Sequence, residues 1–369
     1  MPKPSLLSQC ICQPPMVQQF CLTDWDILIQ QAYSAGVLAR LQWLFERDAL
    51  EEHIPEGCRW HFQSASRFAQ MHKKNVLREV SLIREALHMT GIQPVFLKGA
   101  AYLVCDDDCH QGRVFSDVDI FVPKASLPKV EQVLGWHGWE FAEKDDYDEK
   151  YYRQWMHEIP PLIHIERGTA LDVHHNLLPL IGRIKLNAGL LHKNVQTANN
   201  GFNTLAAQDR ILHSAAHLLL NGEFEHGFRD ISDIYLLIVQ HSQLSSTFLP
   251  SLVERAQQLG LERILLYCLD VLEAIFSLEV SNPLYTQLTS GKSAPSPFVR
   301  GLLRFMHYRA LQPHHPSCRL VGQRVALFGL FLRSHWMKMP VTILVMHLIR
   351  KMWVKPLLDW YKNRHQAGA

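Results

Sequence analysis

The segment 94–122, PVFLKGAAYLVCDDDCHQGRVFSDVDIFV, constrains the fold of this chain more than any other stretch. Residues 94–97 are apolar and partly β-branched, which is typical of a short buried strand. Lys98 and Gly99 follow directly, and glycine allows a tight turn and a close approach of the backbone to a ligand. A helix that starts at Ala100 would direct its free N–H groups into this turn, where phosphate commonly binds. The segment therefore predicts a strand, a phosphate-binding turn and a helix.

A second strand is predicted over residues 116–122, which read SDVDIFV. Because side chains alternate along a strand, Asp117 and Asp119 lie on one face, opposite their apolar neighbours. Two carboxylates on one face, close to a phosphate-binding turn, indicate a site for Mg²⁺ and a nucleotide. An Asp-x-Asp motif alone is weak evidence, and a turn or helix cap is the alternative role for Asp117.

Other motifs accompany this pair in order along the chain: LKG at residues 97–99, Arg113, and LDVH at residues 171–174. Together with SDVD, they resemble the uncharacterised nucleotidyltransferases, a branch of the DNA polymerase β-like nucleotidyltransferase superfamily. The resemblance covers roughly residues 20–240. It implies a nucleotidyltransferase fold and the transfer of an NMP group from an NTP, with ATP as the expected donor. The acceptor would be a hydroxyl or an amine, which the sequence does not identify.

The resemblance also implies the roles of three carboxylates. Asp117, Asp119 and Asp172 are the expected catalytic residues and the expected ligands of Mg²⁺, with Mn²⁺ as the alternative ion. Asp172 is in addition the expected general base. A strand-end aspartate that only bonds backbone amides is the alternative for Asp172.

The expected nucleotide-binding residues are Lys98, Gly99, Ala100, Arg113 and Ser116. Gly99 and the helix after it are expected to hold the phosphates, while Lys98 and Arg113 neutralise their charge. The wider superfamily has a Gly-Ser turn where this chain has Gly99 and Ala100, so Lys98 is expected to compensate for the missing serine hydroxyl. Surface positions are the alternative for Lys98 and Arg113.

Several histidines and one arginine are further candidates. Structural roles are expected for His174, in the LDVH motif, and for Arg229, with support of the site from behind its ligands as the alternative. His213 and His217 have the i,i+4 spacing of metal ligands, but neither the glutamate of an HExxH motif nor a third ligand accompanies them. They are expected to line the contact between a helical region and the active-site cleft.

Helical periodicity dominates the chain outside these motifs and predicts a mostly helical α+β protein. A small mixed β-sheet nucleotidyltransferase core is expected between N-terminal and C-terminal helical regions. Within the core, residues 139–141 read as a strand, and residues 151–165 and 170–177 as the arms of a hairpin that carries Asp172. The predicted divisions are an N-terminal helical region (1–75), the nucleotidyltransferase core (76–188), a helical domain (189–318) and basic amphipathic C-terminal helices (319–369).

Five further segments carry specific expectations. Residues 59–90 are predicted to form a long helix. Residues 1–20 are expected to be poorly ordered, because they are polar and contain Pro and Cys. The charged runs 106–108 and 143–150 are expected to be solvated loops. Residues 281–297, rich in Ser, Pro and Thr, are expected to form a loop or lid.

The last segment, 319–369, contains nine Lys and Arg residues against one acid, Asp359, with apolar residues and tryptophans between them. This pattern allows two interpretations. The segment forms helices that pack on the body with their charges outward, or it makes a peripheral contact with a membrane or an anionic polymer. Charge alone does not separate the two interpretations.

Composition bounds the class of protein. A chain of 369 residues, with 47% hydrophobic and 20% charged residues, can form two or three domains with their own cores. No uninterrupted apolar run approaches the roughly 18–20 residues of a membrane span. The eight cysteines lack paired CxxC spacing and no N-terminal signal is evident, so we expect free thiols in a cytoplasmic protein, with peripheral membrane attachment as the alternative.

Three functions remain open at this point. The first is a Mg²⁺-dependent nucleotidyltransferase that binds an NTP and an unidentified acceptor. The second is a toxin-like nucleotidyltransferase that modifies tRNA or a protein; the basic residues lie far along the chain from the motif, so nucleic acid is the less favoured partner. The third is a non-catalytic nucleotide-binding protein of the same fold, against which the intact Asp117, Asp119 and Asp172 argue.

Overall fold

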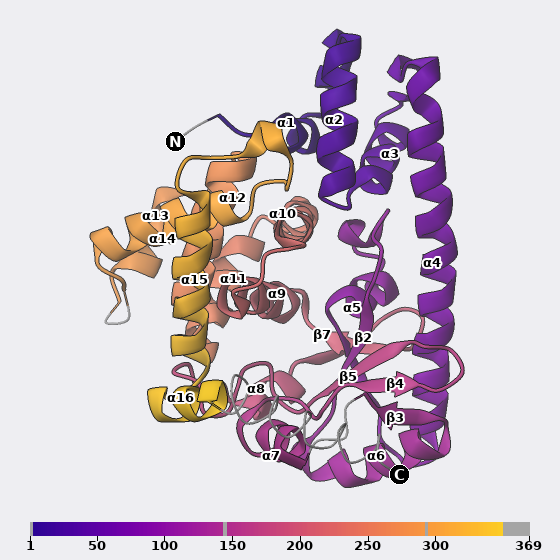
Figure 1. The fold of residues 1–369 in the computed structure, drawn as a ribbon, viewed down its shortest axis with the longest axis vertical. Coiled ribbons are helices and arrows are strands. Elements are labelled where there is room, and N and C mark those ends of the chain that lie inside the picture. Colours follow the sequence, from indigo (N-terminus) through magenta and orange to yellow (C-terminus); the bar gives the residue numbers. More distant parts are fainter. Residues whose placement is uncertain (1–2, 143–145, 292–293, 350–369) are drawn as a thin grey trace, which may run out of the picture.

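A seven-stranded mixed sheet lies at one end of the molecule, and helices make up the remainder (Figure 1). The structure is a computed structural model that describes residues 3–142, 146–291 and 294–349. The expected mostly helical α+β fold is confirmed. The strands are β1 (Val95–Leu97), β2 (Asp117–Phe121), β3 (Trp139–Phe141), β4 (Leu162–His164), β5 (Ala170–His174), β6 (Val195–Thr197) and β7 (Asn203–Leu205), in the order β3-β4-β5-β2-β1-β7-β6.

The helices fall into three groups along the chain. Those that precede the sheet are α1 (Leu6–Cys12), α2 (Leu22–Ser34), α3 (Leu38–Arg47) and α4 (Glu56–His88). Those between the strands are α5 (Lys98–Cys105), α6 (Leu127–Trp136), α7 (Asp146–Trp155) and α8 (Ala188–His192). Those after the sheet are α9 (Ala207–Asn221), α10 (Gly227–Leu244), α11 (Phe248–Leu259), α12 (Glu262–Phe276), α13 (Asn282–Thr289), α14 (Pro297–Ala310), α15 (Gln323–Lys338) and α16 (Val341–Ile349). Short 3₁₀ helices are η1 (Pro14–Gln19), η2 (Glu51–His53), η3 (Asp108–His110), η4 (Lys124–Ser126) and η5 (Pro316–Cys318).

The strand register places the polar residues of β2 and β5 side by side. β2 pairs with β1 in antiparallel fashion, which opposes Leu97 to Asp119, and with β5 in parallel fashion, which opposes Asp119 to Asp172. Paired residues share a face and side chains alternate along each strand. Asp117, Asp119, Asp172 and His174 therefore all lie on one face of the sheet.

The opposite face of the sheet is apolar and packs on α4 and α6. Val118 of β2 and Leu171 of β5 are buried in one cluster with Val80 of α4 and Val130 of α6. This burial fixes the register, because a shift of one residue would turn the carboxylates of β2 into the core.

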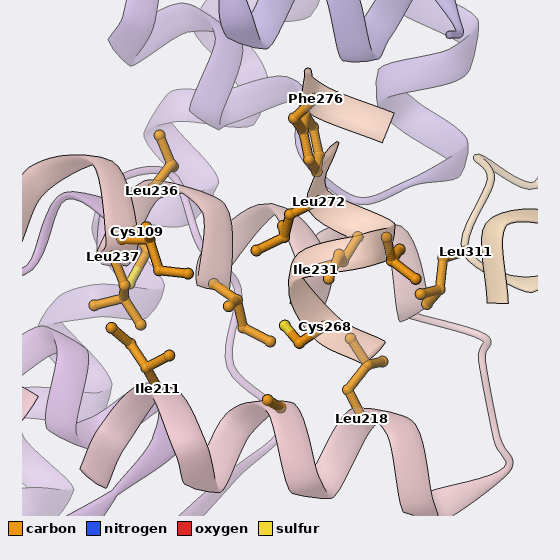
Figure 2. Close-up of a cluster of buried hydrophobic side chains, with 14 of the residues drawn as sticks. Cys109, Ile211, Leu218, Ile231, Leu236, Leu237, Cys268, Leu272, Phe276 and Leu311 are labelled. Atoms are coloured by element: carbon orange, nitrogen blue, oxygen red, sulfur yellow. The ribbon is translucent and has the colours of Figure 1, made fainter. Parts of the chain in front are cut away.

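A second apolar core joins the N-terminal helices to the helices that follow the sheet. Phe45 of α3 is buried in the same cluster as Ile211 of α9, Leu237 of α10 and Leu272 of α12. Figure 2 shows the last three side chains directed into a common space between their helices. The long helix α4 runs along the opposite side of the molecule from α15 (Figure 1). How the chain divides into domains stays a prediction.

Several predicted elements are confirmed. Residues 59–90 form most of α4, and residues 139–141 are β3. The hairpin is present as the antiparallel pair β4–β5, although its first arm is shorter than expected because residues 151–155 belong to α7. Residues 319–349 include α15 and α16, whereas residues 350–369 lie outside the described part of the chain.

Residues 1 and 2 lie outside the described part of the chain, and the prediction that the segment 1–20 is poorly ordered is wrong for residues 3–20. They form α1 and η1, and Leu7 and Cys10 are buried. The Cys12 Sγ donates a hydrogen bond to the backbone oxygen of Phe276 at the end of α12, at 3.0 Å. These contacts join the start of the chain to the end of α12, 264 residues further on, and local composition cannot reveal them.

Two predicted loops contain helix. Residues 282–289, inside the expected loop 281–297, form α13, whose Leu288 is buried. Of the expected charged loop 143–150, residues 146–150 form the first half of α7, and residues 143–145 lie outside the described residues.

The acidic run 106–108 is only partly solvated. Asp106 is exposed, but Asp107 is 2% exposed and its Oδ1 lies 2.8 Å from the Arg210 Nη2 of α9. The expectation of a solvated loop is therefore wrong for Asp107, because a cation from a distant helix stabilises this carboxylate in the interior. None of the helices in the described ranges is long and apolar enough to cross a bilayer.

Candidate functional site

A cavity of about 630 Å³ opens between the polar face of the sheet and the helices that follow it. This volume lies within the range of small-molecule sites. Ala100 does not line the cavity, because its side chain is buried in the sheet core. The predicted residues that do line it are Lys98, Gly99, Arg113, Ser116, Asp117, Asp119, Asp172, His174 and Arg229.

Asp119 is a buried carboxylate on the sheet side of the cavity, held by two hydrogen bonds. It is 2% exposed, and its Oδ1 accepts hydrogen bonds from the Lys98 Nζ at 2.7 Å and the His174 Nε2 at 2.9 Å. Among the hydrogen bonds of the described residues, none uses the other oxygen, Oδ2. The pKa of Asp119 lies well below its usual value, because the Lys98 charge and the His174 hydrogen bond outweigh the effect of burial.

Asp172 has the opposite electrostatic environment. Burial and the negative charges of Asp119 and Glu158 raise the pKa of Asp172 to about 7. For His174, burial alone would lower the pKa, but the Asp119 hydrogen bond and the Glu158 carboxylate raise it. The sheet side of the cavity therefore crowds carboxylates that Lys98 and His174 only partly neutralise.

The crowded carboxylates fit a cation. One donor atom from each of Asp119, Asp172 and His174 lies within 4.8 Å of the others. Asp117 lines the same cavity but stands outside this group, and its Oδ1 accepts a hydrogen bond from the Ser116 Oγ at 2.7 Å. Carboxylate oxygens suit a hard ion such as Mg²⁺, which commonly takes one or two carboxylates together with substrate phosphates.

A second group of donors was not anticipated from the sequence. His157, Glu158 and His174 also bring one donor atom each within 4.8 Å of the others. His157 and Glu158 lie just after α7, where the sequence predicts the first arm of a hairpin and shows no motif. Contacts with β5 and the residues just after it place this loop, among them the bridge between Glu158 and His174, so local pattern carries no signal for it.

The turn between β1 and α5 differs in detail from the expectation. Lys98, not Gly99, adopts the left-handed backbone conformation, with φ of 43°. Gly99 is required for a different reason, because a Cβ at this position would lie 2.6 Å from Cδ1 of Phe115. The unusual backbone at Lys98 directs its ammonium group to Asp119, and such local strain is often concentrated at functional sites.

The helical side of the cavity is built around arginines. Arg113 forms an ion pair with Asp233 of α10, and its Nη2 lies 3.4 Å from the Asp230 Oδ1. Arg229 donates from Nε to the same Asp230 oxygen at 3.0 Å. Burial and the neighbouring charge of Arg113 lower the pKa of Arg229 to about 10, so the Arg229 guanidinium group remains charged at neutral pH.

Arg40 of α3 supports this cluster from behind and is absent from the sequence prediction. It is 1% exposed, and its Nη2 lies 2.5 Å from the Asp233 Oδ1 and 2.7 Å from the backbone oxygen of Cys109. The loop before Arg113 rests directly on α3: Gly112 has φ of 66°, and a Cβ there would lie 2.3 Å from the backbone carbon of Ala39. No local pattern around Arg40 indicates these contacts.

His213 and His217 lie along α9, beside the same cavity. The ring centroids of His174 and His213 are 6.3 Å apart, and those of His213 and His217 are 6.5 Å apart. Burial and the Lys98 charge hold the pKa of both α9 histidines well below the usual value, so both are neutral. Within the described residues neither belongs to a group of three metal donors, and His217 lines the cavity as expected.

A family model described as uncharacterised nucleotidyltransferase matches residues 22–277, from the start of α2 to just beyond α12. The match contains every strand and all the predicted site residues. No curated protein matches the chain. Helices α13–α16 lie beyond the matched residues.

Proposed function

The chain belongs to the uncharacterised nucleotidyltransferase family, and we propose that it transfers the NMP group of an NTP, with ATP as donor, to a hydroxyl or an amine. The family match supports nucleotidyl transfer as the general class of reaction. One observation supports the more specific proposal: Asp119 and Asp172 oppose each other on neighbouring strands and share a cavity with Lys98 and Arg113.

Asp117, Asp119 and Asp172 are the residues that would hold Mg²⁺, or Mn²⁺ in its place. Their oxygens suit a hard cation, and burial together with the negative charges of Asp119 and Glu158 raises the pKa of Asp172. When bound, such an ion neutralises charge on the transferred phosphoryl group and lowers the pKa of the acceptor hydroxyl.

The basic side chains of the cavity would bind and orient the triphosphate. Arg113 and Arg229 present guanidinium groups, which suit phosphate oxygens because they donate two parallel hydrogen bonds. Lys98 neutralises Asp119 and so reduces the repulsion that an incoming triphosphate meets at the sheet. Positioning of this kind supplies most of the catalysis in phosphoryl transfer.

In the reaction, the acceptor oxygen or nitrogen forms a bond to the α-phosphorus while the bond from that phosphorus to pyrophosphate breaks. Pyrophosphate leaves with the electron pair of the broken bond. The acceptor proton passes to the carboxylate of Asp172, which lines the cavity and lies opposite Asp119 on the neighbouring strand.

The test is a direct assay with each of the four NTPs, labelled at the α-phosphate, in the presence of Mg²⁺ and a broad extract of acceptors. We expect label transfer together with pyrophosphate release. Asp119→Asn should reduce the rate roughly 1,000-fold, because the positioned charge it removes is worth several kcal/mol in the transition state. Asp48→Asn, in a surface ion pair with Arg47, is the matched control and should leave the rate unchanged.

The opposite result would be the absence of turnover with all four NTPs, from a folded protein that binds nucleotide equally well with and without Mg²⁺. That outcome would overturn the proposal in favour of a non-catalytic nucleotide-binding protein.

A further inference from the structure

Helices α14, α15 and α16 carry apolar side chains on their outward faces. We name this the α14–α16 surface and define it by Phe298, Leu302 and Phe305 of α14 and Phe328, Leu332 and Trp336 of α15. All six are exposed, Phe298 at 78% and Phe328 at 62%. Val345 and Met346, also exposed, extend the surface onto α16.

The spacing of these residues shows that they form continuous stripes. α15 buries Ala326, Leu330 and Ser334 and packs against α9 with that side. Phe328 and Leu332 follow the same helical period on the opposite side, where a surface helix normally carries polar residues. Figure 1 shows α14, α15 and α16 at the edge of the molecule remote from α4. An apolar stripe in that position indicates an interaction surface.

The charge of this part of the chain indicates what kind of partner it meets. Residues 280–358 contain eleven Lys and Arg residues and no Asp or Glu. Arg300 and Arg304 are paired with acids of α12, Asp270 and Glu273. By contrast, Arg319 and Arg324 are exposed, and neither forms an ion pair within the described ranges. The region therefore offers uncompensated positive charge beside its apolar side chains.

Two guanidinium groups lie directly over aromatic rings of the surface. Arg309 stands 3.4 Å from the ring centroid of Phe305, and Arg183 stands 3.9 Å from that of Trp336. Aromatic rings with a cationic rim are typical of helices that lie in the headgroup region of a membrane. A second copy of this chain is a poor occupant, because a two-fold contact would place like charges opposite each other.

We propose that the α14–α16 surface docks on a membrane that contains anionic lipids, with α14 and α15 lying in the headgroup region. Phe328, Leu332 and Trp336 enter the boundary between headgroups and acyl chains, and Arg319 and Arg324 bind the anionic headgroups. The protein lies on the bilayer without spanning it. The surface belongs to helices beyond the family match, so it adds membrane attachment to the common catalytic body.

The docking surface is connected to the cavity through α15. Met337 and Lys338, at the end of this helix, line the cavity, and the Lys338 Nζ donates to the Asn221 Oδ1 at 2.5 Å. The backbone oxygen of Met337 also accepts a hydrogen bond from the Arg183 N–H at 2.9 Å. Docking would therefore place one rim of the cavity beside the lipid surface.

The experiment is co-sedimentation of the full chain with vesicles of phosphatidylcholine alone and with vesicles that contain about a third phosphatidylglycerol. We expect binding to the anionic vesicles, weakened by salt, and little binding to the neutral ones. The double variant Phe328→Ser/Trp336→Ser should lower the partition coefficient at least tenfold, and Arg319→Gln/Arg324→Gln several-fold. Trp60→Ser/Phe68→Ser, which removes two exposed aromatic residues of α4, is the matched control and should bind like the parent.

Circular dichroism and thermal unfolding establish that each variant is folded before its binding is compared. The proposal is overturned by a folded parent protein that sediments with neither vesicle. It is equally overturned by anionic-vesicle binding that the serine variant leaves intact. A dimer in analytical ultracentrifugation that the serine variant dissociates, without vesicle binding by the parent, would assign the surface to a second copy instead. None of these outcomes depends on nucleotidyl transfer, so the docking proposal and the proposed function stand or fall separately.

Discussion

The two walls of the cavity differ in charge and in the way the chain builds them. The sheet wall presents Asp117, Asp119 and Asp172, with Lys98 as its cation, and its residues come from adjacent strands in fixed register. The helical wall presents arginines, and its parts come from α3, from the loop before β2 and from α10. An NTP has both requirements at once, since its phosphates suit the arginines and its metal ion suits the carboxylates.

This difference in charge predicts how substitutions in each wall affect activity and stability. On the sheet wall, negatively charged carboxylates lie next to each other on adjacent strands. Their repulsion lowers the stability of the fold, but the same arrangement suits the binding of a cation. On the helical wall, Arg40, Arg113 and Arg229 stand against Asp230 and Asp233, so each buried charge has a partner. We therefore expect substitutions in the sheet wall to impair activity first, and substitutions that remove a buried charge from the helical wall to impair folding first.

The largest effect is expected on the sheet wall. Asp172→Asn should reduce turnover roughly 1,000-fold, because it removes several kcal/mol of positioned charge together with the expected base. The same variant should unfold at an equal or higher temperature, because it removes a negative charge that Asp119 and Glu158 disfavour. Turnover and the calorimetric unfolding temperature, measured on one preparation of Asp172→Asn, test the expected loss of activity and the expected gain in stability. A loss of stability with activity retained would contradict the comparison.

The next effect concerns the buried support of the helical wall. Asp233→Ala should lower the free energy of unfolding by about 3–5 kcal/mol, because it leaves the buried guanidinium of Arg40 without its carboxylate. Urea unfolding measures the change. Asp48→Ala, which breaks a surface ion pair with Arg47, should cost less than about 1 kcal/mol. Equal costs for the two variants would show that the buried cluster adds nothing to stability.

A smaller effect is expected from the geometry of the helical wall alone. Arg113→Lys keeps the charge but loses the planar donor pair, and should lower kcat/KM for the NTP about 10–100-fold, the worth of a charge-assisted hydrogen bond. Arg255→Lys changes a similar pair with Asp209 outside the cavity, and is the control for stability effects. Unchanged kcat/KM in Arg113→Lys would remove Arg113 from the phosphate site.

The last effect is absent at neutral pH and appears only in acid, and it concerns a buried histidine in the helices that follow the sheet. Burial and the Arg333 charge lower the pKa of His307 in α14 to about 3. The unfolded chain then binds a proton at about pH 6.5 that the folded chain refuses, so stability falls as the pH drops from 6.5 towards 3, by about 1.4 kcal/mol per pH unit. His307→Gln should flatten this part of the profile in urea unfolding at several pH values. The exposed His314→Gln should not change it, and identical profiles for parent and His307→Gln would contradict the assignment.

The sheet wall could be predicted from the sequence because its information is local. Alternation along SDVD and LDVH places the carboxylates on common faces, and the resemblance supplies the order of the motifs. Arg113 was identified by the same resemblance, but Arg40, which pairs with the same Asp233, was not, since a buried arginine on an ordinary helix has no pattern of its own. His157 and Glu158 were missed for a similar reason, because contacts of their loop with β5 and the residues just after it give them a place.

Errors elsewhere have the same physical origin. Residues 3–20 and Asp107 look solvent-exposed by composition, yet each finds a distant partner that makes burial favourable. The left-handed backbone conformation of Lys98 could not be predicted from the sequence either. Glycine adopts this conformation most easily, so the neighbouring Gly99 was the expected position for it. Composition indicates only whether a residue by itself favours burial or exposure. At these positions, contacts with residues far along the chain determine the burial and the backbone conformation.

The contact of Gly112 with the backbone of α3 bears on the order of assembly during folding. The β2–β5 pair forms from two strands of the sheet. Arg113, by contrast, reaches its position in the cavity only after α3, the Gly112 loop and α10 have come into contact. Contacts between such remote segments form slowly, since chain closure is entropically costly. A folding intermediate that has the β2–β5 pair but lacks the contacts of α3, the Gly112 loop and α10 would therefore hold its carboxylates in place and could not bind a triphosphate.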